Sequence, residues 1–140
     1  MKNILVIDDN DAIRNVIATV LADYGFQLQE AADGETGLQM IRDDMPSLVI
    51  CDINMPGMDG YEVLSLVRQS FTMASVPFIL MTGLMTHDGF RRGMSCGADD
   101  YLFKPFATAE LIEAVMSRLA RQSDVQRAAE TRALKLHQYA

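Results

Sequence analysis

The chain has 140 residues, which fits one domain with one buried core and is too short for a catalytic domain plus an independent output domain. Apolar residues make up 49% and charged residues 22% of the chain, so a disordered or collagen-like protein is excluded. The net charge of −7 argues against direct nucleic-acid binding, and no apolar stretch approaches the roughly 20 residues that span a bilayer. Two cysteines and an N-terminus unlike a signal peptide favour a cytoplasmic protein.

Apolar runs and helical patterns alternate through the first half of the chain. The run at residues 4–7 stops at Asp8 and Asp9, and apolar residues then recur at helical spacing as far as Gly25. Residues 26–31 alternate in the manner of a strand. Asp33 then opens a helix, which Pro46 breaks. This order predicts strand, helix, strand, helix.

The second half continues the alternation. Apolar runs at 48–51, 76–81 and 101–103 predict strands, which end before Asp52, Thr82 and Lys104 respectively. Helices are predicted after each of them, with Asp59 and Thr108 as caps of the first and last. The helix between them, near 86–96, contains Gly89 and Gly93, which each weaken it by about 1 kcal/mol relative to alanine and predict a mobile face.

The element order (βα)5 predicts the fold. Fully apolar strands are typical of parallel sheets covered on both faces, and right-handed crossovers then give a doubly wound α/β sheet. The flavodoxin-like strand order 2-1-3-4-5 is expected. In such sheets the binding site lies beyond the carboxyl ends of the strands, near strands 1 and 3.

The residues at those strand ends indicate phosphoryl chemistry. Asp8, Asp9 and Asp52 must share a small space, because neighbouring strands lie about 4.8 Å apart. Crowded carboxylates are costly unless a cation neutralises them or one of them stays protonated, and hard oxygen ligands suit Mg²⁺. Thr82 offers a hydroxyl and Lys104 a positive charge on the far side, and Asp52 is the natural nucleophile at the centre of the set.

Residues 1 to about 121 resemble the receiver domain of two-component response regulators, the CheY-like fold. Four fragments carry the resemblance: the paired acids at 8 and 9 after Leu-Val-Ile, Asp52 in VICDINMPGMDG, Thr82 in Met-Thr-Gly, and GADDYLFKPF at 97–106. Each fragment alone is weak to moderate, but all four in order at four strand ends are very specific. The resemblance implies a signalling domain and no enzyme beyond self-phosphorylation and self-dephosphorylation.

The resemblance also implies residue roles. Asp52 would accept the phosphoryl group of a histidine kinase or phosphotransfer protein, and Asp9, Asp52 and the backbone carbonyl of Asn54 would ligate Mg²⁺, with Asp8 bound through a water. Lys104 and Thr82 would hold phosphoryl oxygens, Tyr101 would rotate inward as a switch residue, and the bond before Pro105 would be cis. Leu84, apolar where a charged residue could orient an attacking water, favours slow phosphate loss.

Other interpretations stay open at this point. An Mg²⁺-dependent phosphohydrolase of the haloacid-dehalogenase-like class needs a second acid two residues after the nucleophile, where this chain has Asn54. A receiver-like interaction module that never takes phosphate usually lacks one of the key residues, and none is missing here. Tyr101 alone could be an ordinary strand aromatic.

The C-terminal segment is basic and helical in pattern. Residues 118–140 hold five basic and two acidic side chains, and no proline or glycine follows Pro105, so the last helix is expected to reach about residue 139. We expect a receiver domain at 1–121 and a helical extension or linker at 122–140. The chain is then either a complete regulator or a receiver tethered to an output domain. The expected signalling surface for an effector or a homodimer is helix 4, strand 5 and helix 5.

Overall fold

The computed structural model describes residues 2–83 and 87–138, and a parallel sheet lies at its centre. The strands are β1 (Asn3–Ile7), β2 (Gln27–Ala31), β3 (Leu48–Asp52), β4 (Phe78–Thr82) and β5 (Asp100–Phe103). All neighbouring pairs are parallel and the order is β2-β1-β3-β4-β5, so the predicted doubly wound topology is confirmed.

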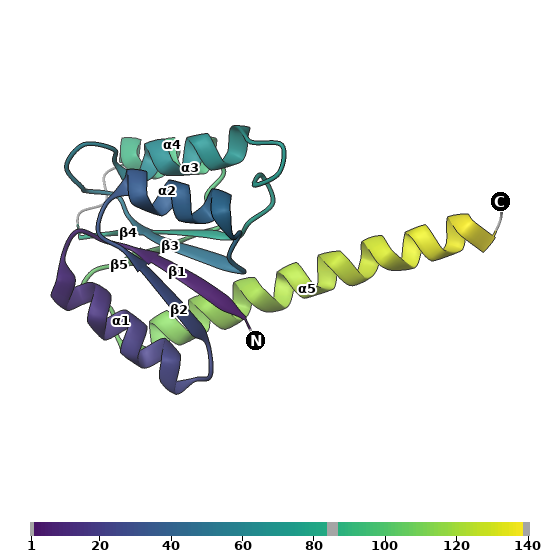
Figure 1. Cartoon of the computed structure of the whole chain (residues 1–140), viewed down its shortest axis with the longest axis horizontal. Helices are drawn as coiled ribbons and strands as arrows, with labels where there is room; N and C mark the ends of the chain where they lie inside the picture. Colours follow the sequence, from purple (N-terminus) through teal and green to yellow (C-terminus); the bar gives the residue numbers. More distant parts are fainter. Residues whose placement is uncertain (1, 84–86, 139–140) are drawn as a thin grey trace.

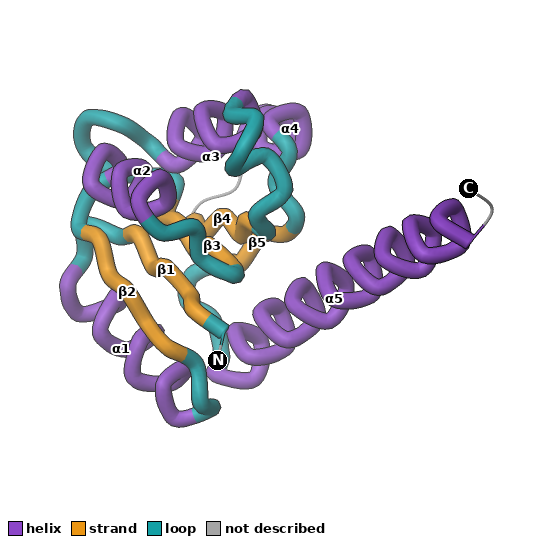
Figure 2. The backbone as a smooth tube through the Cα atoms, turned by 45° about the vertical axis from the view of Figure 1, so that its right-hand side comes forward, coloured by secondary structure: helices purple, strands orange, loops and turns teal. Residues whose placement is uncertain are grey.

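Helices cover both faces of this sheet. They are α1 (Asp11–Asp23), α2 (Gly34–Asp43), α3 (Gly60–Gln69), α4 (His87–Cys96) and α5 (Thr108–Gln138). Figure 1 shows α1 and α5 on one face of the sheet and α2, α3 and α4 on the other, and Figure 2 shows the same layers from a second side. The arrangement follows from right-handed crossovers between parallel strands.

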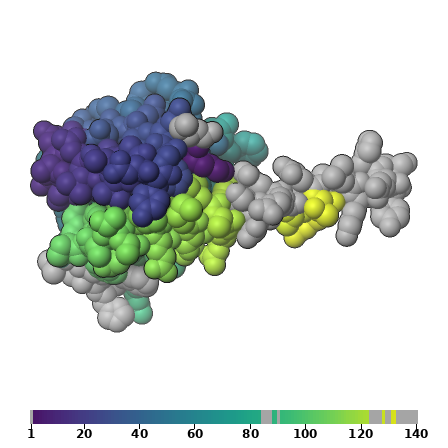
Figure 3. Space-filling view, turned by 90° about the horizontal axis from the view of Figure 1, so that it is seen from below, coloured from purple at the N-terminus to yellow at the C-terminus, as the bar shows by residue number. Residues whose placement is uncertain are grey.

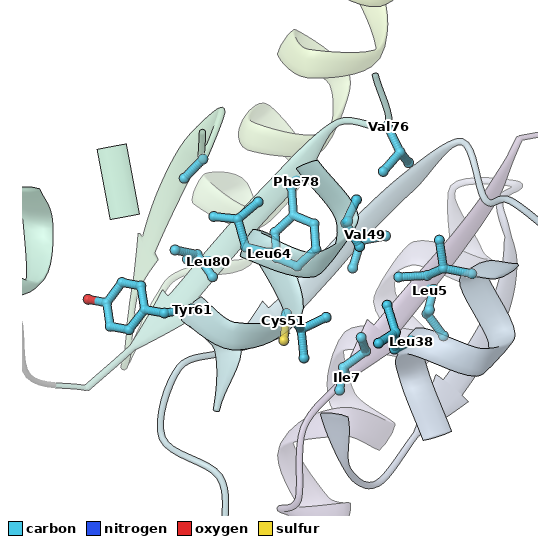
Figure 4. Close-up of a cluster of buried hydrophobic side chains, with 14 of the residues drawn as sticks. Leu5, Ile7, Leu38, Val49, Cys51, Tyr61, Leu64, Val76, Phe78 and Leu80 are labelled. Atoms are coloured by element: carbon cyan, nitrogen blue, oxygen red, sulfur yellow. The ribbon is translucent and has the colours of Figure 1, made fainter. Parts of the chain in front are cut away.

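Two apolar cores separate the layers. Side chains of alternating parity on each strand point to opposite faces, so Leu5 packs toward α2 and α3 while Ile4 packs toward α1 and α5. Figure 4 shows the first core, in which Phe78 and Leu64 lie among the strand residues. β3 and β4 are buried along their whole length. These two rigid strands carry Asp52 and Thr82 at their ends.

The helix starts agree with the expected caps except at α5. The side chains of Asp33 and Asp59 accept hydrogen bonds from backbone N–H groups in the first turns of α2 and α3. Thr108, expected to be a cap, is the first helical residue instead. The residue before it, Ala107, donates its N–H to the Glu110 carboxylate at 3.2 Å, which is one half of a capping box.

The last helix runs well past the sheet. It is continuous from Thr108 to Gln138, as the lack of breakers predicts. Among the side chains of this helix whose burial is described, the buried ones are Leu111, Val115 and Leu119. Figure 3 shows α1 and the first part of α5 side by side on one face. Within the described ranges, none of the helices combines the length and the apolar character that crossing a membrane requires.

Candidate functional site

The strand order brings four predicted site residues to one edge of the sheet. Asp8 follows β1, Asp52 ends β3, Thr82 ends β4 and Lys104 follows β5, and these strands are neighbours in that order. The register places Asp52 beside Met81, one residue before Thr82. The carboxyl ends of the strands therefore present carboxylates, a hydroxyl and an ammonium together.

Three carboxylates form the acidic part of the site. Asp8, Asp9 and Asp52 each offer one oxygen, and these oxygens lie within 4.8 Å of one another. Asp8 is fully buried, Asp52 is 5% exposed, and Asp9 is open to solvent. Like charges at this spacing repel one another, so the cluster favours a cation at its centre.

Lys104 supplies the positive charge on the other side. Its Nζ lies 2.9 Å from Oδ2 of Asp8 and 3.4 Å from Oδ1 of Asp52. Burial lowers the pKa of Lys104, but the hydrogen bond to Asp8 and the attraction of both carboxylates outweigh it and raise the pKa above its ordinary value. Lys104 is therefore positively charged at neutral pH.

At Asp52, burial outweighs the effect of the nearby positive charge on the pKa. Burial raises the pKa of its carboxyl, and the nearby Asp8 and Asp9 raise it further, while Lys104 acts against them, and the net direction is upward. Keeping Asp52 ionised in this site therefore costs free energy. A group that binds its oxygens, whether a metal ion or a phosphoryl group, relieves that cost.

The loop after β1 is held by contacts that sequence reasoning missed. Asp8 accepts a hydrogen bond from the N–H of Asn10 at 2.9 Å. Arg14 donates to the backbone carbonyl of Asp8 at 2.7 Å and forms ion pairs with Asp11 and Glu30. The i, i+3 spacing of Asp11 and Arg14 was the only signal, and it indicates an ordinary helix ion pair rather than a brace for the site.

Sequence reasoning also missed the role of Gly60, which packs against the end of β3. A Cβ atom at this position would lie 2.5 Å from the carbonyl oxygen of Asp52 and 2.8 Å from Cα of Ile53, both backbone atoms that cannot rotate away. Gly60 also donates its N–H to the Ile53 carbonyl at 3.0 Å. Because Gly60 has no side chain, the start of α3 can pack directly against the backbone of Asp52. Asn54, two residues beyond Asp52, is exposed in the same loop.

The remaining predicted residues lie along β4 and β5. Thr82 is buried at the end of β4, and Lys104 donates its backbone N–H to the Thr82 carbonyl at 2.8 Å. The Lys104–Pro105 peptide bond is cis, as the resemblance implies. Tyr101 is buried, with its hydroxyl 3.4 Å from the Gly89 carbonyl. Leu84, on which slow phosphate loss was expected, lies outside the described residues.

The donor set fits a hard divalent cation. Carboxylate oxygens are the ligands that Mg²⁺ prefers, and an exposed Asp9 beside two buried acids leaves room for the waters this ion retains. Among the residues that the structure describes, no imidazole or thiolate belongs to the cluster, which argues against zinc.

Comparison with known proteins assigns the family. The profile of the response regulator receiver domain matches residues 4–116. The probable transcriptional regulator ycf27 of Porphyridium aerugineum is 39% identical over 120 residues, covering 86% of this chain and 49% of the relative. Transcriptional regulatory protein AfsQ1 of Streptomyces coelicolor is 36% identical over 126 residues, covering 88% of this chain and 55% of the relative. The chain therefore spans about half the length of the curated relatives it matches.

Solved structures agree with this assignment. The chemotaxis protein CheY4 of Vibrio cholerae superposes with a TM-score of 0.81 at 29% identity, covering 84% of this chain and 98% of CheY4. NtrX of Brucella abortus superposes with a TM-score of 0.85 at 28% identity, covering 94% of this chain and 30% of NtrX. Fold, strand-end residues and sequence agree, and the chain belongs to the family of response regulator receiver domains.

Proposed function

We propose that this receiver domain accepts a phosphoryl group on Asp52 in an Mg²⁺-dependent reaction and signals the event to an effector. The observation that carries the proposal is the meeting of three acids with Lys104 at one edge of the sheet, with Thr82 at the neighbouring strand end. Receiver domains are signalling domains rather than classical enzymes. Self-phosphorylation and self-dephosphorylation are the only chemistry proposed for the chain itself.

The phosphoryl transfer requires little covalent chemistry from the protein. A carboxylate oxygen of Asp52 attacks phosphorus, a new O–P bond forms, and the bond from phosphorus to the donor's histidine nitrogen breaks, so that the imidazole leaves. Lys104 holds one phosphoryl oxygen by charge, and the hydroxyl of Thr82 donates to another. Positioning and charge stabilisation are what this transfer needs most.

The acidic cluster contains the residues that would hold the metal. Its proposed ligands are Asp9, Asp52 and the backbone carbonyl of Asn54, with Asp8 acting through a bound water. When bound, Mg²⁺ neutralises charge on the carboxylates and the phosphoryl oxygens. The proposal matches the open position of Asp9 and the full burial of Asp8, which already pairs with Lys104.

A histidine kinase or phosphotransfer protein is the proposed donor. A shallow apolar groove lies beside Lys104, between α1 and the loop that joins β5 to α5, where such a partner can dock while its histidine faces Asp52. Its lining residues are Ala12, Ile13, Val16, Lys104, Pro105 and Phe106. A donor of this kind and the two free cysteines fit a protein that works in the cytoplasm.

The proposed output surface is formed by α4, β5 and α5. Met94 on α4 and Phe103 on β5 are about half exposed, although large apolar side chains are usually buried. An effector, an attached output domain or a second copy of the chain would read this surface. We propose 1–121 as the receiver and 122–140 as a helical extension or linker; no direct contact with nucleic acid or membrane is proposed for the chain.

Site mapping tests the proposal. Wild-type protein is incubated with acetyl phosphate and Mg²⁺ and then reduced with borohydride, which converts a phosphorylated aspartate into homoserine, and peptides are sequenced by mass spectrometry. Homoserine is expected at position 52. Asp59→Asn, a conservative change at the cap of α3, is the matched control and is expected to label normally. Absence of label at position 52 would favour the alternative, an interaction module that works without phosphate.

A further inference from the structure

Gly93 on α4 has no side chain, and the Tyr101 ring occupies the space where one would lie. A Cβ atom at Gly93 would overlap the Tyr101 hydroxyl oxygen, and it would lie 2.5 Å from Cζ of the same ring and 3.1 Å from a methyl of Leu80. Real Cβ atoms do not approach other atoms so closely, so the ring and any side chain at position 93 exclude each other. The backbone of α4 therefore forms one wall of the Tyr101 site.

A second tyrosine binds the same helix. The Tyr61 hydroxyl, from α3, donates to the Gly89 carbonyl at 2.7 Å, and the Tyr101 hydroxyl, from β5, donates to the same oxygen at 3.4 Å. Figure 4 shows Tyr61 at the edge of the apolar core, with its oxygen pointing away from Leu64. One carbonyl of α4 is thus shared by phenols from two different elements.

Burial makes the Tyr101 hydroxyl harder to ionise. Burial, with smaller contributions from Tyr61 and Cys96, raises the pKa of Tyr101 to about 12. The guanidinium of Arg92 lies 4.6 Å from the Tyr61 ring, so the cation stabilises the α3 phenol from the solvent side. Neither contact depends on the metal or phosphoryl site.

We propose that Gly93, Leu80 and the Gly89 carbonyl form a seat for the Tyr101 ring, here named the α4 seat, and that Gly93 is the residue that positions Tyr101 and thereby ties α4 to β5. A side chain at position 93 closes the α4 seat. Tyr101 must then leave it, or α4 must move away from β5 while Tyr61 retains its own bond to Gly89. The inference rests on the proposed function only in its last step, the response of α4 to phosphorylation of Asp52.

A double-mutant cycle tests the seat directly. Gly93→Ala is compared in the wild-type background and in Tyr101→Leu, which lacks the atoms nearest to the new methyl. With Tyr101 present, the alanine is expected to lower the folding equilibrium constant. In the Tyr101→Leu background, it is expected to raise that constant about two- to fivefold, because alanine favours helix over glycine. Urea unfolding supplies both constants.

Ser95→Ala, on an exposed position of the same helix, is the matched control and is expected to have the same effect in both backgrounds. An equal effect of Gly93→Ala in both backgrounds would overturn the proposal. If Gly93→Ala alone does not fold, recovery of the fold in the double variant supports the α4 seat, and loss of fold in both contradicts it.

The phenol itself gives a readout that a purely structural role would not move. At pH 11 a seated Tyr101 remains mostly protonated, whereas a displaced one with an ordinary pKa of about 10 is mostly ionised. The difference in tyrosinate absorbance between each protein and its Tyr101→Phe partner isolates this group. Gly93→Ala is expected to increase its ionised fraction several-fold, and an unchanged fraction would overturn the proposal.

Hydrogen exchange over residues 87–96 then tests the coupling. After acetyl phosphate treatment, wild-type protein is expected to change its exchange in α4, and Gly93→Ala is expected to show little of that change. Intact mass of the same samples reports phosphoryl uptake. If no phosphoryl group is taken up, the proposed function is contradicted, and the unfolding and absorbance results alone test the α4 seat. If the group is taken up and hydrogen exchange in α4 changes equally in wild type and Gly93→Ala, the coupling is refuted.

Discussion

Neutralising Asp52 should stabilise the domain in the absence of metal. Asp52 is 5% exposed, and burial together with Asp8 and Asp9 raises its pKa, so its ionised form is disfavoured in the folded state. Asp52→Asn keeps the shape of the side chain and removes the charge. The variant is therefore expected to be more stable than wild type in EDTA at neutral pH, although it removes the central residue of the site.

The size of the effect follows from the geometry. At an effective dielectric constant of about 20, Lys104 at 3.4 Å attracts the Asp52 carboxylate by about 5 kcal/mol. Asp8, whose oxygen lies within 4.8 Å, offsets at least about 3.5 kcal/mol of that attraction, whereas solvent screens the repulsion from exposed Asp9. Burial is the largest cause of the raised pKa, and its cost of a few kcal/mol exceeds the attraction that is left. We therefore expect Asp52→Asn to gain about 1–2 kcal/mol, which corresponds to a rise in Tm of about 3–10 °C for a domain of this size.

Thermal unfolding followed by circular dichroism in EDTA, repeated from pH 4 to 7, measures this. Because the pKa of Asp52 is raised above 3.8, the folded state holds its proton more tightly than the unfolded state, so this group's contribution to wild-type stability falls as pH rises through the raised pKa. The advantage of Asp52→Asn should therefore be smallest near pH 4 and grow toward pH 7. Mg²⁺ should reduce that advantage, because it stabilises wild type more than the variant.

Asp59→Asn is the control for a generic effect of replacing an aspartate, since asparagine caps a helix equally well, and no change in Tm is expected. A Tm of Asp52→Asn equal to or below that of wild type in EDTA at pH 7 would refute the electrostatic reasoning. An advantage that does not vary with pH would attribute the gain to something other than the charge.

Three further predictions concern packing next to the site and elsewhere in the domain. Gly60→Ala should destabilise the domain by more than about 2 kcal/mol in urea unfolding and slow phosphoryl uptake, because the new methyl meets the backbone of Asp52; unchanged stability would contradict the close packing. Arg68→Met should cost about 2–4 kcal/mol, since this half-buried guanidinium donates to three backbone carbonyls and one carboxylate, and Arg68→Lys should recover only part of it. Cys51 should react with a disulfide reagent far more slowly than the partly exposed Cys96, because burial raises the pKa of the Cys51 thiol. The two rates are measured in the single variants Cys96→Ser and Cys51→Ser, and equal rates would argue against the burial of Cys51.

The fold was predictable because local and global signals agree. Continuous apolar runs mark the strands, and the αL glycine at 25, which has φ of +91°, ends the first helical pattern as expected. Strand limits were less accurate. The third long apolar run begins at Val76, but β4 begins at Phe78, because Pro77 has no N–H to donate to a ladder.

The charged centre of the site was predictable and its supports were not. Asp8, Asp52, Thr82 and Lys104 stand out because each polar residue directly follows or ends an apolar strand. Arg14, Gly60 and Gly93 each act on a residue six to eight positions away in the sequence, through hydrogen bonds and close packing that no periodicity in the sequence predicts. Gly93 was noted only as a weak point of its helix, whereas the structure shows an aromatic ring against it.

The most direct test of the account is the intact mass of the protein after incubation with acetyl phosphate, measured for wild type and Asp52→Asn with Mg²⁺ and with EDTA. The account predicts a gain of one phosphoryl group in wild type with Mg²⁺, little or none in EDTA, and none in Asp52→Asn under either condition. A full gain in Asp52→Asn, or no gain in wild type with Mg²⁺, would contradict the claim that these strand ends form a phosphoryl-accepting site.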